Sequence, residues 1–258
     1  LMINATRQQW LRWCDDKKQW YSCELGEEIE AAKVIAQMLV EKAKQALASG
    51  QEAAGKAMMK HAIRTHDKPR LEAMVSLAIS EPGMSVRQVD LDKQKHLLGV
   101  KNGVVNLEDG KLLFNTPDLL ITKYCPVNFD PDAEGKVWPD FLAQIMQDDE
   151  LTIKTLQRNL GCTLSGQTLE ELLFIWYGWG ANGKSVLANI IRYILGDYAV
   201  IAPASLLTAR RQGDNGPRND QAALAGARLV LINELGSDEA LDEQTVKHLA
   251  GREPISAR

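Results

Sequence analysis

Cysteine is scarce in this chain of 258 residues, and its four cysteines are scattered (Cys14, Cys23, Cys125 and Cys162). No two of them form a CxxC pair, so the spacing excludes both a zinc knuckle and a disulfide framework. The four histidines form no helical i, i+4 pair of the kind that binds a metal. We therefore expect reduced thiols and no structural metal site.

Long apolar runs are also lacking. No stretch of about 18 apolar residues could span a bilayer, and the chain begins at Leu1 without the basic segment and apolar core of a signal peptide. The formal net charge of −4 excludes a protein that coats nucleic acid by bulk electrostatics. One basic stretch departs from this average, because residues 42–70 hold seven Lys or Arg. A solvated helix face is the favoured explanation, and a local nucleic-acid contact is the alternative.

The composition predicts a mainly helical N-terminal part that starts with a hairpin. Three tryptophans surround a turn-like segment at residues 15–17, which predicts a small hairpin. They are Trp10, Trp13 and Trp20. Their rings either pack in a core, which we favour, or stack on bases. Residues 27–79 are rich in Ala, Lys, Glu, Met and Leu, with interruptions near Gly50 and at Pro69, which predicts three helices.

A second hairpin and a connector separate this part from the rest of the chain. Two apolar runs, 103–107 and 111–114, flank an Asp-Gly turn, which is a strong hairpin signal. Four prolines between residues 115 and 139 predict an extended connector. Residues 141–160 have helical periodicity with an acidic interruption. We expect three parts, at residues 1–115, 116–160 and 161–258.

Residues 178–185 match the P-loop pattern G-x-x-x-x-G-K-[ST] without a mismatch. In this pattern the glycines let backbone N–H groups turn inward around phosphates, and the following helix N-terminus favours negative charge. Lys184 is expected to reach the β- and γ-phosphates, and the Ser185 oxygen to bind Mg²⁺. The implied cofactors are ATP and Mg²⁺. The residues expected to hold the nucleotide are Gly178, Gly180, Ala181, Asn182, Gly183, Lys184, Ser185 and Val186.

The neighbours of this motif fit a strand–loop–helix unit. Residues 172–177 form a continuous apolar run that is typical of a buried parallel strand. The residues after the motif form one apolar helix face, which ends at Gly196. Its members are Leu187, Ile190, Ile191, Ile194 and Leu195. We therefore expect a nucleotide site between a strand and a helix of an α/β fold.

Hydrolysis needs a second acidic group on a neighbouring strand, and Glu234 is the candidate. It ends the run 229–234, whose four apolar residues predict a buried strand with polar residues at its carboxyl end. The alternative is that Glu234 only begins a turn. Asn233 can hydrogen-bond a metal-bound water but brings no charge, so metal binding would rely on the nucleotide phosphates. We expect Lys184, Asn233 and Glu234 to be catalytic, and Ser185 and Glu234 to bind the metal.

With both motifs placed, the chain resembles the superfamily 3 helicases, specifically the C-terminal part of phage and plasmid primase-helicases and their poxvirus-type relatives. The resemblance covers roughly residues 97–258, and roughly the first 90 residues look like that family's helical preceding module. The segments that carry it are 102–104, 158–161, 180–185, 224–229, 247–251 and 255–258. It implies an α/β fold, an AAA+-like P-loop ATPase of the superfamily 3 type. Such a fold has a parallel sheet with helices on both faces, here preceded by a mainly helical N-terminal module with a β-hairpin.

The same resemblance implies a DNA helicase for phage or plasmid replication, a hexameric ring that hydrolyses ATP to translocate on single-stranded DNA. Lys247 and Arg258 match the basic positions of the DNA-contacting stretch, although residues 249–253 depart from the family's usual run. Lys247 could equally be a solvated helix residue. We also expect a primase domain upstream in the parent chain and a location in the cytoplasm of a bacterial host. A sensor and an arginine finger are expected beyond Arg258, so this chain should bind nucleotide without hydrolysing it efficiently.

Two other functions remain open. An origin initiator would bind DNA under ATP control without unwinding it, and a small-molecule kinase would transfer a phosphoryl group to a metabolite. The ATPase rate with and without single-stranded DNA separates the three. Asp90 and Asp92 form a D-x-D that could suggest primase metal chemistry. A structural role is favoured, because no strand pattern surrounds them.

Overall fold

The computed structural model describes residues 2–5, 9–167, 171–208, 223–233 and 240–251. The chain divides into two compact units, of which the first combines residues 1–93 with 116–122 and the second combines 94–115 with 123–258. This division differs from the three expected parts, because the second hairpin groups with the P-loop; the three-part division stays a prediction. Within the described residues, no helix is both long and apolar enough to cross a membrane.

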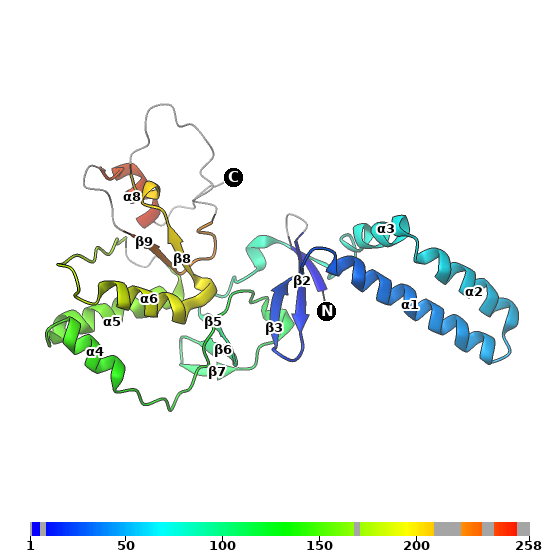
Figure 1. Cartoon of the computed structure of the whole chain (residues 1–258), viewed down its shortest axis with the longest axis horizontal. Helices are drawn as coiled ribbons and strands as arrows, with labels where there is room; N and C mark the ends of the chain where they lie inside the picture. Colours follow the sequence, from blue (N-terminus) through cyan, green and yellow to red (C-terminus); the bar gives the residue numbers. More distant parts are fainter. Residues whose placement is uncertain (1, 6–8, 168–170, 209–222, 234–239, 252–258) are drawn as a thin grey trace. The chain divides into compact units, whose positions relative to one another are not determined.

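A four-stranded sheet opens the first unit (Figure 1). Its strands are β1 (Met2–Ala5), β2 (Gln9–Cys14), β3 (Gln19–Ser22) and β4 (Ser85–Val86), in the order β3-β2-β1-β4. Trp13 and Trp20 are register partners whose rings touch edge to face in the core, with centroids 5.5 Å apart. The Trp20 indole also donates to the carbonyl of Pro117 at 3.1 Å, in the short helix η2 (Pro117–Leu119). The predicted first hairpin is confirmed, and these two rings pack in a core.

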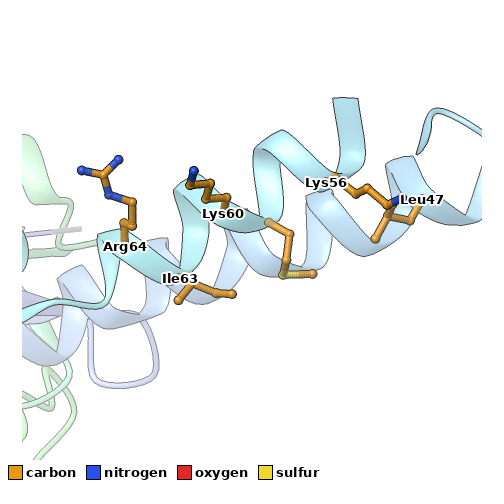
Figure 2. A pocket seen from close by; sticks show the side chains of 6 residues that line it. Leu47, Lys56, Lys60, Ile63 and Arg64 are labelled. Atoms are coloured by element: carbon orange, nitrogen blue, oxygen red, sulfur yellow. The ribbon is translucent and has the colours of Figure 1, made fainter. Parts of the chain in front are cut away.

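Three helices follow this hairpin, namely α1 (Glu27–Ala48), α2 (Glu52–Thr65) and α3 (Lys68–Ala78). They confirm the predicted three helices and their breaks. Gly50 is left-handed after α1 (φ 81°), which suits a residue without Cβ, and Pro69 lies in the first turn of α3. The two longer helices approach closely at Gly55, where a Cβ would lie 2.6 Å from Leu47 Cγ. A shallow hollow between them is lined by both apolar and basic side chains (Figure 2).

The second unit begins with a three-stranded antiparallel sheet of β5 (Leu97–Val100), β6 (Gly103–Asn106) and β7 (Lys111–Leu113), in that order. Strands β6 and β7 confirm the second predicted hairpin. Its turn closes at Gly110, which has φ 69° and donates its N–H to the Asn106 carbonyl at 2.8 Å. The connector predicted over residues 115–139 is confirmed only in part. Residues 123–136 contain no helix and one bridge residue, Cys125, but η2 lies at Pro117–Leu119 and a helix begins at Val137.

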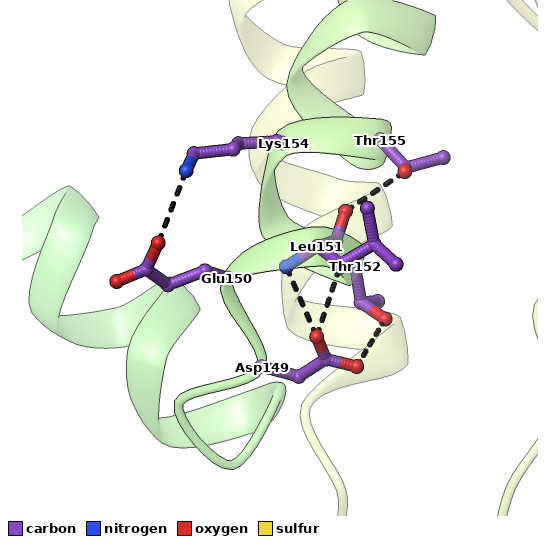
Figure 3. Close-up of polar contacts among 6 residues, drawn as sticks. All are labelled: Asp149, Glu150, Leu151, Thr152, Lys154 and Thr155. Atoms are coloured by element: carbon purple, nitrogen blue, oxygen red, sulfur yellow. Dashed lines mark hydrogen bonds and ion pairs between the residues drawn. The ribbon is translucent and has the colours of Figure 1, made fainter.

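Helices α4 (Val137–Ile145) and α5 (Glu150–Ser165) match the helical segment predicted around 141–160, with the break at the acidic run. Asp149 caps α5 (Figure 3), and its carboxylate accepts from the Leu151 N–H at 3.0 Å and from the Thr152 hydroxyl at 2.7 Å. The Thr152 hydroxyl is the main cause that lowers the pKa of Asp149, because its hydrogen bond favours the ionised carboxylate. The Asp149 carboxylate therefore accepts hydrogen bonds from backbone N–H groups of the first turn, which have no acceptor within the helix.

Helix α6 (Lys184–Leu195) follows the P-loop motif and packs on a two-stranded parallel sheet. Strand β9 (Leu229–Ile232) confirms the position of the strand predicted in 229–234, although its side chains are half-buried or exposed instead of buried. It pairs in parallel with β8 (Ala199–Ala202), which fits an α/β fold. Leu187, Ile191 and Leu195 of the predicted apolar face are buried in the core. The remaining elements are η1 (Gln88–Asp90) in the first unit, with η3 (Gly196–Tyr198), η4 (Ala204–Leu206) and α8 (Glu243–Ala250) in the second.

The expected strand before the P-loop is not formed. Residues 172–177 contain no strand, and their side chains are exposed, Tyr177 at 91% and Ile175 at 69%. A strand needs a hydrogen-bonded neighbour, and among the described residues β8 and β9 pair only with each other. The prediction of a buried strand from apolar composition was therefore wrong for this structure. A larger parallel sheet with helices on both faces stays a proposal.

Candidate nucleotide-binding site

The P-loop runs from Gly178 to Gly183 and leads directly into α6. Gly183 has φ 84°, and a Cβ there would lie 2.5 Å from Ile145 Cγ2. Gly178 has φ 148°, and a Cβ there would lie 2.4 Å from Asn182 Nδ2. A Cβ at Gly180 would meet open space. The backbone conformation and close packing therefore require glycine at two of the three glycine positions.

Lys184 begins α6 and folds its ammonium back over the loop. Its Nζ donates to the Gly178 carbonyl at 2.8 Å, to the Trp179 carbonyl at 3.2 Å and to Asn182 Oδ1 at 2.8 Å. The positive charge is thus held among the acceptors of the loop itself. The pairing with Asn182 could not be found from the sequence, since the motif specifies only the glycines, the lysine and the hydroxyl residue.

The N-terminus of α6 opens toward the loop. The first bond of this helix runs from the Leu187 N–H to the Gly183 carbonyl at 2.9 Å, so the preceding N–H groups have no acceptor within the helix. Ser185 and Val186 supply two of these groups, and both residues are exposed. Ala181, with φ 61°, turns the loop just before the helix. Free N–H groups at a helix N-terminus favour an anion, so the residues present fit a nucleotide phosphate.

Of the two polar residues expected after β9, Asn233 and Glu234, the structure describes Asn233. Asn233 directly follows β9 and is exposed, at the edge where the carboxyl ends of both parallel strands lie. Glu234, the expected catalytic acid, lies outside the described residues. In the described part of the chain, no three His, Cys, Asp or Glu residues gather to hold a metal. Of the two expected metal ligands, Ser185 and Glu234, the structure describes Ser185, which lies in the first turn of α6.

Arg228 anchors the start of β9, a role that no sequence motif signals. Its guanidinium donates to the carbonyls of Leu164 and Leu97, the latter at 2.6 Å, and its Cζ lies 4.4 Å from the ring centre of Tyr198. The buried Tyr198 hydroxyl in turn accepts from the Gly99 N–H at 3.0 Å. These contacts join α5, β5 and the parallel sheet, although the residues lie far apart in the sequence.

The expected DNA contact Lys247 lies in α8 and pairs with Glu243 one turn away, with Nζ 2.6 Å from Oε1 and the lysine side chain 74% exposed. An exposed pair of this kind contributes little to stability, so the ammonium stays accessible to another anion. Arg258 lies outside the described residues. Both DNA contacts stay predictions.

The D-x-D pair is engaged in local structure. Asp90 forms an ion pair with Arg87 at 2.7 Å, which lowers the pKa of its carboxyl. Asp92 accepts from the Thr122 N–H at 2.8 Å and from the Thr122 hydroxyl. Both carboxylates therefore have partners that fit the favoured structural role.

Comparison with known proteins identifies relatives among large DNA viruses. A family model described as "D5 N terminal like" matches residues 1–147. A protein of Acanthamoeba polyphaga mimivirus, provisionally named a helicase, is 33% identical over 175 residues, which cover 66% of this chain and 18% of the relative. A protein of African swine fever virus (isolate Tick/Malawi/Lil 20-1/1983), provisionally named a primase, is 29% identical over 174 residues, covering 65% of this chain and 18% of the relative. The chain thus spans about a fifth of the length of these relatives.

The family match lies mainly in another part of the chain than the resemblance to superfamily 3 helicases, which we placed at residues 97–258. The family model ends at residue 147, before the P-loop, and covers the part that we expected to be a preceding module. A protein of Frog virus 3 (isolate Goorha), also provisionally named a helicase, is 30% identical over 119 residues, covering 46% of this chain and 12% of the relative. These sources support a link to viral replication, and they give no support to a bacterial host.

Proposed function

This chain belongs to the D5 N terminal like family, and from that premise we propose that it is part of a viral replication primase-helicase and that its P-loop binds ATP. The relatives provisionally named helicases and primases support the first half of this proposal. One observation carries the second half. A glycine loop leads into the open N-terminus of α6, and the ammonium of Lys184 lies over that loop.

Each residue of the site would have its own role in binding ATP and Mg²⁺. The Lys184 ammonium would leave its loop acceptors for the β- and γ-phosphates, and the N–H groups of Ser185 and Val186 would donate to phosphate oxygens. The Ser185 hydroxyl would bind Mg²⁺, which neutralises developing charge in phosphoryl transfer. Glu234 would orient water, and Asn233 would hydrogen-bond a water bound to the metal.

The proposal extends to a superfamily 3 DNA helicase that translocates on single-stranded DNA as a ring of identical chains, a hexamer. Lys247 and Arg258 would contact the DNA, and a primase domain would lie elsewhere in the parent protein. The parallel pairing of β8 and β9 supports an ATPase sheet of the α/β type, to which further strands would add.

The ATPase rate of the longer parent protein, measured with and without single-stranded DNA, tests this function, since we expect this chain alone to bind nucleotide without hydrolysing it efficiently. Stimulation that is lost in Glu234→Gln, with ATP binding retained, is the expected result, because the amide keeps the shape and removes the charge that orients water. Nucleotide-dependent DNA binding without turnover would favour an origin initiator instead. Dependence on a metabolite acceptor would favour a small-molecule kinase.

A further inference from the structure

A hollow beside α1 and α2 combines an apolar floor with basic side chains. It has a volume of about 400 Å³. Its lining residues are Leu47, Lys56, Met59, Lys60, Ile63 and Arg64 (Figure 2). Leu47 is 36% and Ile63 is 61% exposed. On a face that only contacts solvent, exposed apolar side chains among the cations would be unfavourable, so a ligand that covers them would be stabilised.

The cations of the hollow repeat regularly along α2. Lys56, Lys60 and Arg64 follow at four-residue spacing, and we call them the basic stripe. Four residues advance a helix by about 6 Å, so the three charges lie on successive turns of one side. The side chains of Lys60 and Arg64 point to the same side of the helix (Figure 2). A ligand with evenly spaced negative charges would match this repeat.

The charge of the basic stripe is only partly neutralised within α2. Residues 42–70 contain seven Lys or Arg and two carboxylates. One of these, Glu52, pairs with Lys56 at 2.5 Å, and such an exposed pair is weak enough to exchange for another anion. Among the residues that the structure describes, Lys60 and Arg64 have no ion pair. The stripe is therefore locally positive in a chain with a formal net charge of −4.

The helices packed against α2 do not supply the missing negative charge. The second half of α1 contains two lysines and one carboxylate, Glu41, which pairs with Lys44 of the same helix at 2.9 Å. The single carboxylate of α3, Glu72, pairs with Lys68 at 3.6 Å. The partner that completes the charge balance of the stripe is therefore expected to be an external polyanion.

We propose that the basic stripe and the apolar floor of the hollow bind a single strand of DNA. Phosphates lie along Lys56, Lys60 and Arg64, and base faces lie against Leu47 and Ile63. A single strand exposes the apolar faces of its bases, whereas a duplex stacks them inside, so the single strand is the form that can cover the floor. Contacts to phosphates and base faces carry no sequence information, so the binding is independent of sequence.

This site lies in the first unit, whereas the positions expected to contact DNA, Lys247 and Arg258, belong to the second. The choice of DNA as the ligand rests on the proposed role in replication. The contact itself uses neither ATP nor the P-loop, so a loss of ATP binding would leave it intact. ATP binding by the same preparations therefore distinguishes a failure of this site from a failure of the nucleotide site.

Binding of a fluorescent oligodeoxythymidine by the full chain without nucleotide tests the site. Lys56→Gln with Lys60→Gln and Arg64→Gln should weaken this binding about ten- to a hundredfold at ~0.15 M salt, because three phosphate contacts are lost. The plot of log affinity against log salt concentration should also become shallower by about 2, since each phosphate contact of a single strand contributes about 0.7 to its slope.

Matched controls separate the site from general changes in charge and hydrophobicity. Lys33→Gln with Lys101→Gln and Lys136→Gln also removes three exposed cations, and it should leave the salt slope unchanged. Ile63→Ser should weaken binding about fivefold, whereas Leu77→Ser, at a similarly exposed position of 67%, should not. Circular dichroism of each variant confirms that the helices remain.

Several results would overturn the proposal. The wild type could fail to bind the oligonucleotide, or the stripe variant could bind with the affinity and salt slope of its control. Tighter binding of a duplex than of the single strand would rule out the contact between bases and floor. Displacement of the strand by polyglutamate at an equal concentration of charge would assign the stripe to an acidic protein. Binding that is lost in Lys247→Gln and retained in the stripe variant would place the DNA on α8 and leave the proposed function standing.

Discussion

Removing the guanidinium of Arg228 is expected to destabilise the second unit by about 3–5 kcal/mol. Arg228→Met keeps the apolar stem but removes both donors, including the one that lies 2.6 Å from the Leu97 carbonyl. A hydrogen bond from a charged donor contributes about 1.5–3 kcal/mol, and a cation over a ring about 0.5–2 kcal/mol. The sum exceeds our value because such contributions are not additive and the methionine still packs against Tyr198.

Hydrogen exchange of the peptides that cover β5 and β9 measures this loss directly, because it reports the free energy of opening for each segment. Arg192→Met is the matched control, since Arg192 is exposed on α6 and has no side-chain hydrogen bond among the described residues. Arg228→Lys should give an intermediate loss, because one ammonium cannot reproduce the fork of a guanidinium.

Equal protection of β5 and β9 in Arg228→Met and Arg192→Met, within about 0.5 kcal/mol, would refute the reasoning. It would mean that the contacts of Arg228 do not hold the parallel sheet to its neighbours.

Three further predictions concern the loop, a helix cap and the thiols. Gly183→Ala should weaken ATP binding by at least about tenfold, because a Cβ strains the left-handed backbone of residue 183 and collides with the Ile145 side chain. An unchanged ATP affinity in a titration would contradict this. The pKa of Asp149 is lowered in the folded state, so its stabilising effect should be present above the unfolded value near ~4 and lost as the pH falls through the folded value. Asp149→Asn should remove that pH dependence from the hydrogen exchange of α5, and an unchanged acid profile would count against the cap. Burial raises the pKa of the Cys125 thiol to about 11, whereas Cys162 is exposed. A thiol reagent at neutral pH should therefore label Cys162 before Cys125. Mass spectrometry that finds Cys125 labelled as fast as Cys162 would refute the burial of Cys125.

Local patterns in the sequence predicted local structure well. The helices of residues 27–79, both hairpins and the buried face of α6 follow from periodicity, turn residues and helix breakers. These signals depend on residues that are close together in the sequence, so they can be recognised without knowledge of the tertiary structure.

Longer-range features could not be predicted in this way. The parallel pairing of β4 with β1 joins residues about 80 positions apart, and the contacts of Arg228 depend on carbonyls that any residue could supply. Apolar composition alone misidentified residues 172–177 as a strand, because a strand is defined by its partner as much as by its own side chains. In the candidate site, the motif located the loop and Lys184, while the hydrogen bond from Lys184 to Asn182 emerged only from the structure.

The most direct test of the central claim is the equilibrium binding of ATP to the wild type and to Lys184→Ala in the presence of Mg²⁺, with Lys101→Ala as the control for a lost surface charge. We expect the control to bind like the wild type and Lys184→Ala to bind about ten- to a hundredfold more weakly, since at least one charge-assisted hydrogen bond to phosphate is lost. Equal ATP affinity of all three proteins, with the folds intact, would contradict the assignment of this loop as a nucleotide site.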